Sequence, residues 1–485
     1  MGPQAIALFI FAVCSFAQAP APAHGRRYAR LVIRNAMVVE GNGTPARGPL
    51  DIVVENGRIA EVRPPGAGRT GQAGAEIDAT GQHVLPGFVN MHGHSHDERG
   101  GAAMPVEYVF KLWLACGITT VRDVGSNFEM ARRMRDGSRA GTVVAPRLFL
   151  YPFFGRPPDA EAARARVREL KRKGADGIKI VGIHRDTMDA MMEESHKLGL
   201  RVAHHLGVEE TTAWDCIRNK TTSIEHWYGI PDAALSAGVQ NFPAGYNYND
   251  ELDRFRHAGR LWREAEPARL DKVLEAMVKA GVAWDPTLNI YEASRDLQRA
   301  QNKPEFREYL HPALAKFFEP SRENHGSYFF HWTTADEVYW KENYRLWMSA
   351  LRRFAAMGGV VTAGEDAGYI YQIYGFGYLR ELELQQEAGF HPLKVVQHAT
   401  VNGALVLGEQ SRLGRVRVGW AADLVIVKGN PLENFKILTP LAGGIQWTVK
   451  DGFVYSPAVL LSEVRQMAAG RTTGTPVERL ERQVQ

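Results

Sequence analysis

Histidines occupy alternate positions, His92, His94 and His96, in the stretch FVNMHGHSHD (88–97). In a β-strand, residues two positions apart lie on the same face, so His92 and His94 are expected to point together from the end of a strand. Neutral imidazole is a common ligand of divalent metal ions, and two such side chains on one face predict a metal site. His96 follows the strand, where a contact with substrate or with a metal ligand is expected rather than direct ligation.

Polar side chains occur at matching positions in several other apolar segments. Lys179 lies between two isoleucines, a position where burial is costly unless the amine is neutral or paired. Three further segments end in His204 and His205 (AHHL), His226 (SIEH) and Asp366 (GED). Imidazole and carboxylate groups that converge on one rim suit zinc or a similar divalent ion. The alternative, a set of unrelated buried polar residues, leaves several desolvation costs without compensation.

These residues belong to a regular alternation of segments between Pro86 and Gly408. Short apolar segments of strand type alternate with amphipathic segments of helical spacing, such as 159–175 and 268–281. Repeated βα units indicate an α/β protein with a (β/α)8 TIM barrel at 85–408, whose sites lie at the carboxyl ends of the strands. Eight strands are expected, at 87–94, 117–123, 146–152, 177–182, 201–205, 221–226, 282–288 and 359–366.

Short β-branched runs separated by glycine-rich turns precede and follow the barrel segment. We expect residues 24–84 and 409–485 to form a small discontinuous β-sandwich domain. Inside the barrel segment, two long aromatic-rich connections, 227–252 and 289–347, predict lids or additional helices.

The first 23 residues differ in kind from the rest of the chain. An apolar run at 5–16 precedes the small-residue pattern AQA (17–19), which is typical of a signal peptide at 1–23. An uncleaved anchor is the alternative, although the run is short for a bilayer span. We therefore expect export to the periplasm or the extracellular space, with no stable membrane span after cleavage.

Composition limits the classes of partner. With 485 residues, 45% of them hydrophobic, the chain has ample material for a large core. A net charge of only +4 gives little support for nucleic-acid binding, so no nucleic acid is expected as a partner. Cys116 and Cys216 lie in apolar contexts, which favours core packing over a disulfide. The oligomeric state is left open, with a homo-oligomer among the alternatives.

Motifs along most of the chain resemble those of the amidohydrolase superfamily, in particular its imidazolonepropionase-like and prolidase-like metal-dependent hydrolases. They occur in that family's order within 31–454: VLPGFVNMHGH, GITTVRDVG, GADGIKI, VAHHLG, SIEH, AGEDAG and GWAADLVIVKGNPLEN. Each motif alone has little specificity, whereas the ordered set is highly specific.

The resemblance implies a site for two divalent metal ions, with Zn2+ as the first choice. The ligands that it implies are His92, His94 and Asp366 for a buried ion, and His205 and His226 for a more exposed one. Lys179 would react with carbon dioxide, and the resulting carbamate would bridge both ions. A salt bridge from Lys179 to Asp366, without a carbamate, is the alternative. His204 is expected to face the helices.

The reaction that the resemblance implies is hydrolysis of an amide bond in a small molecule, such as a dipeptide-like or N-acyl amino acid substrate. A hydroxide bridging the metal ions would attack the carbonyl, and Asp366 would shuttle the proton to the leaving amine. The candidates for substrate contact are His96, Tyr228, Tyr291 and Arg295, although packing roles explain the last three equally well. Arg122 and Asp123 are expected to form a structural ion pair, and Glu365 to point away from the site.

Other functions on the same barrel remain open. A mononuclear deaminase or cyclic-amidine hydrolase ranks lower, because Val208 stands where such relatives carry an acid or amide, and Lys179 would have no role. A lactone or ester hydrolase is a further alternative, since the same nucleophile attacks either carbonyl. A non-enzymatic scaffold is disfavoured because no expected metal ligand is missing.

Overall fold

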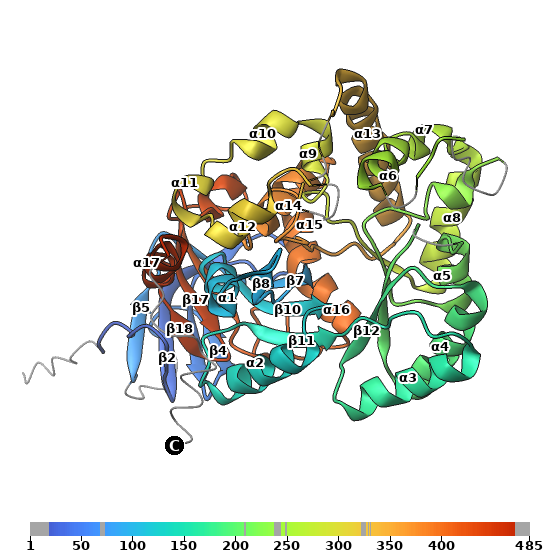
Figure 1. Cartoon of the computed structure of the whole chain (residues 1–485). Coiled ribbons are helices and arrows are strands. Elements are labelled where there is room, and N and C mark those ends of the chain that lie inside the picture. Colours follow the sequence, from blue (N-terminus) through green and yellow to red (C-terminus); the bar gives the residue numbers. More distant parts are fainter. Residues whose placement is uncertain are drawn as a thin grey trace, which may run out of the picture.

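The computed structural model describes residues 19–67, 73–207, 210–236, 244–247, 250–321, 326–327, 329 and 331–470. It contains a sheet built from both chain ends and a larger α/β part (Figure 1). Most of the predicted signal peptide, Val208 and the last 15 residues lie outside the described residues. Within the described residues, no helix combines the length and the apolar character needed to cross a lipid bilayer.

Strands from both ends of the chain form one nine-stranded sheet, in the order β1-β18-β17-β16-β6-β2-β3-β4, with β5 paired to β2. They are β1 (Arg26–Arg27), β2 (Arg30–Val38), β3 (Arg47–Glu55), β4 (Arg58–Arg63), β5 (Ala75–Asp78), β6 (Gln82–Pro86), β16 (Leu424–Lys428), β17 (Ile445–Lys450) and β18 (Phe453–Tyr455). The blue and red strands therefore lie side by side in Figure 1.

The predicted β-sandwich is not confirmed. Strand β6 pairs in parallel with β2 and antiparallel with β16, so the strands of the two chain ends join one hydrogen-bonded path instead of two facing sheets. One face of this sheet carries a core of alternating apolar residues that includes Leu31, Ile33, Leu424 and Ile426.

Seven parallel strands form the centre of the α/β part. They are β7 (Phe88–Gly93), β10 (Ile118–Val124), β11 (Arg147–Tyr151), β12 (Gly177–Val181), β13 (Arg201–His205), β14 (Ser223–Glu225) and β15 (Ala283–Asp285). Regular pairing divides them into a three-stranded sheet, β11-β10-β7, and a four-stranded sheet, β12-β13-β14-β15. This mixed α/β arrangement is consistent with a TIM barrel, although no closed barrel is detected among the described residues.

Single backbone hydrogen bonds connect the two sheets. The amide of Lys179 donates to the carbonyl of Pro152 at 3.0 Å, which joins β12 to the end of β11. The eighth expected strand, 359–366, makes only an isolated bridge at Val361 instead of a regular strand. This segment still forms backbone hydrogen bonds to the strands on either side of it. The amide of Thr362 donates to the carbonyl of Trp284 in β15 at 3.0 Å, and the amide of Asp366 donates to the carbonyl of His92 in β7 at 2.8 Å.

Helices follow most of the parallel strands. They are α1 (Val106–Ala115), α2 (Phe128–Ala140), α3 (Ala160–Arg172), α4 (Arg185–Lys197), α5 (Ala213–Asn219), α6 (Glu251–Ala258), α7 (Leu261–Glu264), α8 (Pro267–Ala280), α9 (Glu292–Arg295), α10 (Leu297–Gln301), α11 (Phe306–Tyr309), α12 (Pro312–Phe317), α13 (Thr334–Ala356), α14 (Phe376–Glu387), α15 (Pro392–Gln397), α16 (Gly403–Leu407) and α17 (Pro457–Ala468). The smaller elements are β8 (Glu98–Arg99), β9 (Ala102–Ala103), two 3-10 turns (Asp232–Ala234 and Phe435–Leu438) and a π-helical turn (His398–Asn402).

The predicted helices at 159–175 and 268–281 are confirmed as α3 and α8. Helix α3 begins where the side chain of Asp159 accepts a hydrogen bond from the amide of Ala162, and α8 ends at Gly281, whose φ is 74°. The side chain at the first position satisfies a free amide, and glycine adopts the left-handed conformation without steric cost.

The longer connection contains additional helices, as expected: residues 289–347 include α9 to α12 and most of α13. In the connection at 227–252, the described residues contain the 3-10 turn Asp232–Ala234 and only the first two residues of α6. Buried aromatic rings hold these helices against the α/β part: Tyr291 stacks on Trp340 with ring centroids 5.7 Å apart, and Trp227 packs at 6.0 Å from Trp347. The added helices therefore pack beside the strand ends, where Tyr291 and Ile290 line the cavity.

Candidate metal centre

A cavity of about 230 Å³ lies at the carboxyl ends of the parallel strands. Its lining includes each of the six residues predicted as metal ligands: His92, His94, Lys179, His205, His226 and Asp366. The rest of the lining is largely apolar and consists of Phe153, Val181, Arg254, Phe255, Ile290, Tyr291, Tyr369 and Ile370. Side chains separated by more than half of the sequence thus meet around one space.

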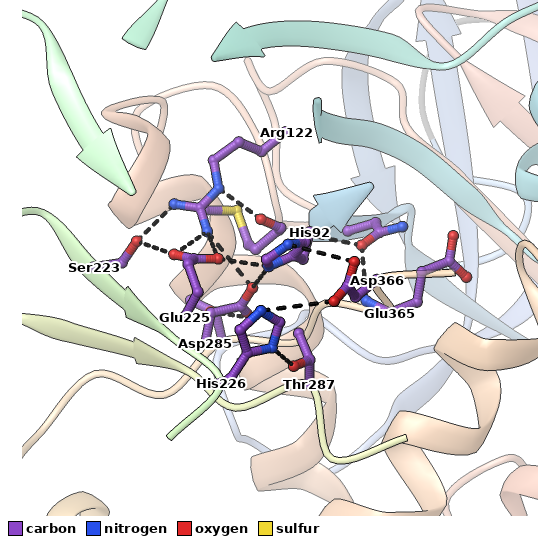
Figure 2. Close-up of polar contacts among 12 residues, drawn as sticks. His92, Arg122, Ser223, Glu225, His226, Asp285, Thr287, Glu365 and Asp366 are labelled. Carbon is purple, nitrogen blue, oxygen red and sulfur yellow. Dashed lines mark hydrogen bonds and ion pairs between the residues drawn. The ribbon is translucent and has the colours of Figure 1, made fainter. Parts of the chain in front are cut away.

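The carboxylate of Asp366 faces three imidazoles, and Figure 2 shows two of them, those of His92 and His226. Its Oδ1 lies 2.9 Å from Nε2 of His94 and 3.6 Å from Nε2 of His92, and its Oδ2 lies 3.6 Å from Nε2 of His226. The Nε2 atoms of three imidazoles therefore lie within 3.6 Å of one carboxylate, as expected for side chains that bind the same cation.

Lys179 lies among these groups with its amine 3.3 Å from Nε2 of His92. Burial lowers the pKa of Lys179 to about 8, against the opposing influence of nearby carboxylates. Burial, together with the positive charge of Lys179, also holds the pKa of His92 and of His226 well below the ordinary value. Both imidazoles are therefore neutral at pH 7, the form that binds metal ions.

Left-handed backbone at the strand ends brings His226 and Asp366 into the site. Their φ angles are 60° and 47°, values that residues other than glycine seldom adopt. At His226 the break in the strand lets two successive residues, Glu225 and His226, both point inward, which regular alternation forbids. A hydrogen-bonding contact of 2.5 Å between Nδ1 of His226 and Oγ1 of Thr287 helps to hold this conformation.

His205 completes the group on the outer side. Its ring lies edge-on to that of His226, with centroids 4.6 Å apart, and stacks on Tyr228 at 5.5 Å. His204, the neighbouring histidine, is fully buried on the opposite face, where Nδ1 lies 3.4 Å from Sγ of Cys216 in α5. As expected, His205 faces the cavity and His204 faces the helices.

A buried ionic network lies directly beneath His92, and the sequence analysis missed it. Glu225 has its Oε2 2.7 Å from Nδ1 of His92, and both of its oxygens lie 2.8 Å from Nη2 of Arg122. Asp285 lies 3.5 Å from the same guanidinium nitrogen and accepts a hydrogen bond from Thr362 at 2.8 Å. Each of these groups is fully buried.

The two carboxyl groups of this network differ in protonation. Burial, followed by the neighbouring Glu225, raises the pKa of Asp285 to about 8. Burial also opposes ionisation of Glu225, but the charges of Arg122 and Lys179 outweigh it and lower the pKa of Glu225. At neutral pH one negative charge, on Glu225, therefore balances the guanidinium of Arg122.

The predicted ion pair between Arg122 and Asp123 is wrong. Successive strand residues point to opposite faces, so Arg122 enters the interior and pairs with Glu225, whereas Asp123 accepts a hydrogen bond from the amide of Ser126. A signal for the missed residues was present in the sequence: Glu225 and Asp285 are carboxylates within apolar strand segments, the same criterion that identified Lys179.

Glu365 points away from the cavity, as expected, but it is tightly bound. Its carboxylate accepts hydrogen bonds from the indole of Trp113 and from the amides of Gly375, at 2.7 Å, and Tyr378, at 3.1 Å. Burial raises the pKa of Glu365 to about 8 despite these donors. The side chain therefore anchors the segment that carries Asp366.

The four candidates for substrate contact lie in different surroundings. Tyr291 lines the cavity, and its ring meets that of His226 edge-on at 5.5 Å. Tyr228 is mostly buried behind His205, and His96 stacks on His94 with Nδ1 2.6 Å from the hydroxyl of Tyr374. Neither residue is part of the cavity lining. Both pack against predicted metal ligands instead, Tyr228 against His205 and His96 against His94.

Arg295, a candidate for substrate contact, does not reach the cavity. Its guanidinium donates to both carboxylate oxygens of Glu387, at 2.7 and 2.9 Å, and lies over the ring of Tyr344. It is not part of the cavity lining, because α9 directs it toward α14. The described residue that brings a guanidinium to the cavity is Arg254 of α6.

The donor set fits a divalent metal ion. Single donor atoms of His92, His94 and Asp366 lie within 4.8 Å of one another, and the nitrogen and oxygen donors are of the kinds that zinc prefers. A second group with this spacing is His92, Glu225 and Asp285, and both of its carboxylates lie within 3.5 Å of Nη2 of Arg122, so a guanidinium already supplies the positive charge there. The cavity side of His92 is thus the side available to an ion.

Comparison with known proteins gives one family match and several similar folds. The matching family is described as "Amidohydrolase family", and it covers residues 83–252 and 354–454. A curated relative, dihydroorotase from Trichlorobacter lovleyi, is 42% identical over 71 residues, which are 14% of this chain and 15% of that protein. This match spans far less than two thirds of the relative.

Solved structures match over almost the whole chain. A Xaa-Pro dipeptidase with methionine bound in its active site has 19% identity and a TM-score of 0.62, covering 88% of this chain and 100% of its own. A protein described as a prolidase from Bifidobacterium longum has 20% identity and a TM-score of 0.64, covering 90% of this chain and 100% of its own. At such identities these likenesses concern the fold.

Proposed function

Because this chain belongs to the amidohydrolase family, we propose that it is a binuclear metal-dependent hydrolase that cleaves an amide bond of a small molecule. Water would add to the carbonyl carbon, the carbon–nitrogen bond would break, and the products would be a carboxylic acid and an amine. The observation that carries the proposal is the convergence of four imidazoles, a buried lysine and Asp366 on one cavity.

The ligands in this proposal are those expected from the sequence. His92, His94 and Asp366 would hold the deeper of two divalent ions, taken as Zn2+, and His205 and His226 the outer one. Lys179, as a carbamate formed with carbon dioxide, would lie between them; its depressed pKa supports the amine form that this reaction requires. The ions would supply an activated water and would polarise the carbonyl group.

Asp366 has the position of a general acid–base group. Its carboxylate is 13% exposed, faces the cavity and contacts the imidazole of His94 at 2.9 Å. In this proposal, Asp366 accepts a proton from the attacking water and then donates it to the leaving nitrogen. The left-handed backbone at Asp366, braced by Glu365, holds the carboxylate in place for both transfers.

The walls of the cavity favour a substrate with one compact apolar half. Phe153, Val181, Phe255 and Ile290 present apolar surface, and Tyr291 adds an aromatic face beside His226. Arg254 is the described lining residue outside the ligand set with a permanent charge, which suits a substrate carboxylate. These features support dipeptide-like or N-acyl amino acid substrates.

Two further proposals concern the whole chain. We propose that the connecting backbone hydrogen bonds complete a closed (β/α)8 barrel at 85–408, with the nine-stranded sheet as a discontinuous accessory domain. We also propose that residues 1–23 direct export to the periplasm or the extracellular space.

Metal analysis combined with an activity panel tests the proposed function. Purified protein should contain two divalent ions per chain and should hydrolyse members of a panel of dipeptides, N-acyl amino acids and lactones. Lys179→Ala should lose metal and amidase activity, whereas Lys171→Ala, at an exposed position on α3, should retain both. Less than one ion per chain, or full activity in Lys179→Ala, contradicts the proposal.

A further inference from the structure

Glu225 lies outside the proposed ligand set, yet it contacts the inner nitrogen of His92. Oε2 of Glu225 is 2.7 Å from Nδ1 of His92, and the two side chains are 0% and 2% exposed. The two atoms are close but are not aligned as a hydrogen bond; because an ionised carboxylate has no proton to donate and repels a lone pair, the contact favours the tautomer of a neutral His92 that has its proton on Nδ1. The lone pair of His92 is then on Nε2, which lies 3.3 Å from the amine of Lys179 at the cavity.

Three further contacts fix the carboxylate of Glu225. The hydroxyl of Ser223 donates to Oε1 at 2.6 Å, and Nη2 of Arg122 lies 2.8 Å from both oxygens. Arg122 is itself held, because its Nη1 donates to Ser223 at 2.8 Å and its Nε donates to the carbonyl of Met91 at 2.6 Å. Met91 precedes His92 in the chain, so the same arginine braces both the backbone beside the histidine and the carboxylate behind its ring (Figure 2).

This arrangement differs from a salt bridge that only stabilises the fold. A buried ion pair is often replaceable by apolar residues without loss of stability, so burial alone does not explain why these charges are present. Their placement against the far nitrogen of an imidazole does explain it. A partner at one ring nitrogen determines the orientation of the ring and the nitrogen that is available to a metal ion.

We propose that Glu225, fixed by Arg122 and Ser223, is a positioning residue that orients His92 and sets the affinity of the deeper metal ion. The inference rests on the proposed function, since it concerns a ligand of that site. Neither Glu225 nor Arg122 touches the substrate in this account, and both act through His92. Their effect is therefore on metal binding first and on turnover as a consequence.

The test measures Zn2+ affinity of the full-length protein by competition with a chromophoric chelator, after removal of bound metal. Glu225→Gln keeps the shape of the side chain, but its amide turns a donor toward either Arg122 or His92 and so breaks one of the two contacts. Loss of such a supporting partner should weaken the binding of one ion about 10–100-fold. The visible absorption spectrum of Co2+ bound in place of Zn2+ should also change, because the orientation of a ligand changes.

The matched control is Glu292→Gln. Glu292 is also a buried carboxylate paired with an arginine, Arg380, at 2.6 Å, but among the described residues it contacts no imidazole. Its replacement should leave Zn2+ affinity and the Co2+ spectrum unchanged. If Glu225→Gln does not fold by circular dichroism, Glu225→Asp retains the charge beside Arg122 and withdraws the carboxylate from His92, and the same weakening is expected.

The outcomes separate the two proposals. Wild-type protein that binds no Zn2+ contradicts the proposed function. Wild-type protein that binds two ions, with a folded Glu225 variant of equal affinity and identical Co2+ spectrum, overturns the positioning role alone. Equal weakening in Glu292→Gln also overturns it, because the effect would then follow from loss of any buried carboxylate.

Discussion

Two buried arginines on neighbouring strands of the α/β part, Arg122 and Arg147, each pair with two carboxyl groups. Arg122 of β10 contacts Glu225 and Asp285, and Arg147 of β11 contacts Asp423 at 2.6 Å and also Asp451. Thr120 is the β10 residue level with Arg147, so Arg122 lies two residues closer to the carboxyl ends of the strands, about 7 Å along them.

The neighbours of the two networks differ. The network of Arg122 lies against His92, whereas Asp423 directly precedes β16 and Asp451 lies in the turn between β17 and β18 of the nine-stranded sheet. The network of Arg147 therefore joins the sheet to the α/β part, whereas the network of Arg122 lies against a ligand of the proposed metal centre. A buried arginine paired with two carboxylates does not by itself identify a functional site. The site is identified by how close the arginine lies to the carboxyl ends of the strands and by which group it orients.

The largest expected difference is in catalysis, between the cavity above the network of Arg122 and the network of Arg147. Asp366→Asn should lower kcat/KM about 10²–10⁴-fold, since an asparagine cannot accept and return a proton. Asp423→Asn, the same chemical change in the network of Arg147, should leave kcat/KM unchanged. Steady-state kinetics with the best substrate of the panel measures both. Equal losses in the two variants would mean that the two ends of the strands do not differ in their importance for catalysis.

The network of Arg147 should dominate stability instead. Arg147→Met leaves Asp423 buried without its cation and should reduce the free energy of unfolding by about 3–5 kcal/mol. Urea unfolding followed by tryptophan fluorescence measures the loss, and metal content should stay at the wild-type value. Arg132→Met is the control, because its pairs on α2 are exposed and are worth about 0.5 kcal/mol. A fully stable Arg147→Met with reduced metal content is the result that contradicts this assignment.

A smaller effect is expected at the wall of the cavity. Arg254→Met should raise KM about 10-fold for substrates with a free carboxylate, by loss of one charged hydrogen bond. The matched amide-capped substrates should show no such increase. Comparison of the two substrate series measures the effect within one variant, and an equal change in both would mean that Arg254 does not bind the carboxylate.

The smallest effect is expected for Arg295→Met. Arg295 binds Glu387, which is 44% exposed, so the free energy of unfolding should fall by about 1 kcal/mol and KM should not change. Thermal unfolding and the same kinetic assay check the two values. A large increase in KM would restore Arg295 as a substrate contact and would require α9 to move on binding.

The amino-acid sequence by itself predicted the family, which the family match confirms, and the α/β class of the fold. It also identified six polar side chains that line the cavity, because each is a polar group at or near the end of an apolar segment, where a barrel places its site. His92, His94, Lys179, His205 and His226 could be selected one segment at a time. Each segment contains its own signal, a polar group where an apolar one is expected.

The tertiary structure alone decided which of these groups support one another. Left-handed backbone at His226 places Glu225 and His226 on the same side, and strand alternation gives no indication of this. The pairing of Arg122 with Glu225, across 103 positions, depends on the packing of two strands rather than on either motif. Likewise, the pairing of β6 with β2 and β16 joins the chain ends in one sheet, and α9 turns Arg295 away from the cavity. Local patterns determine which face a residue occupies, but long-range contacts determine its partner.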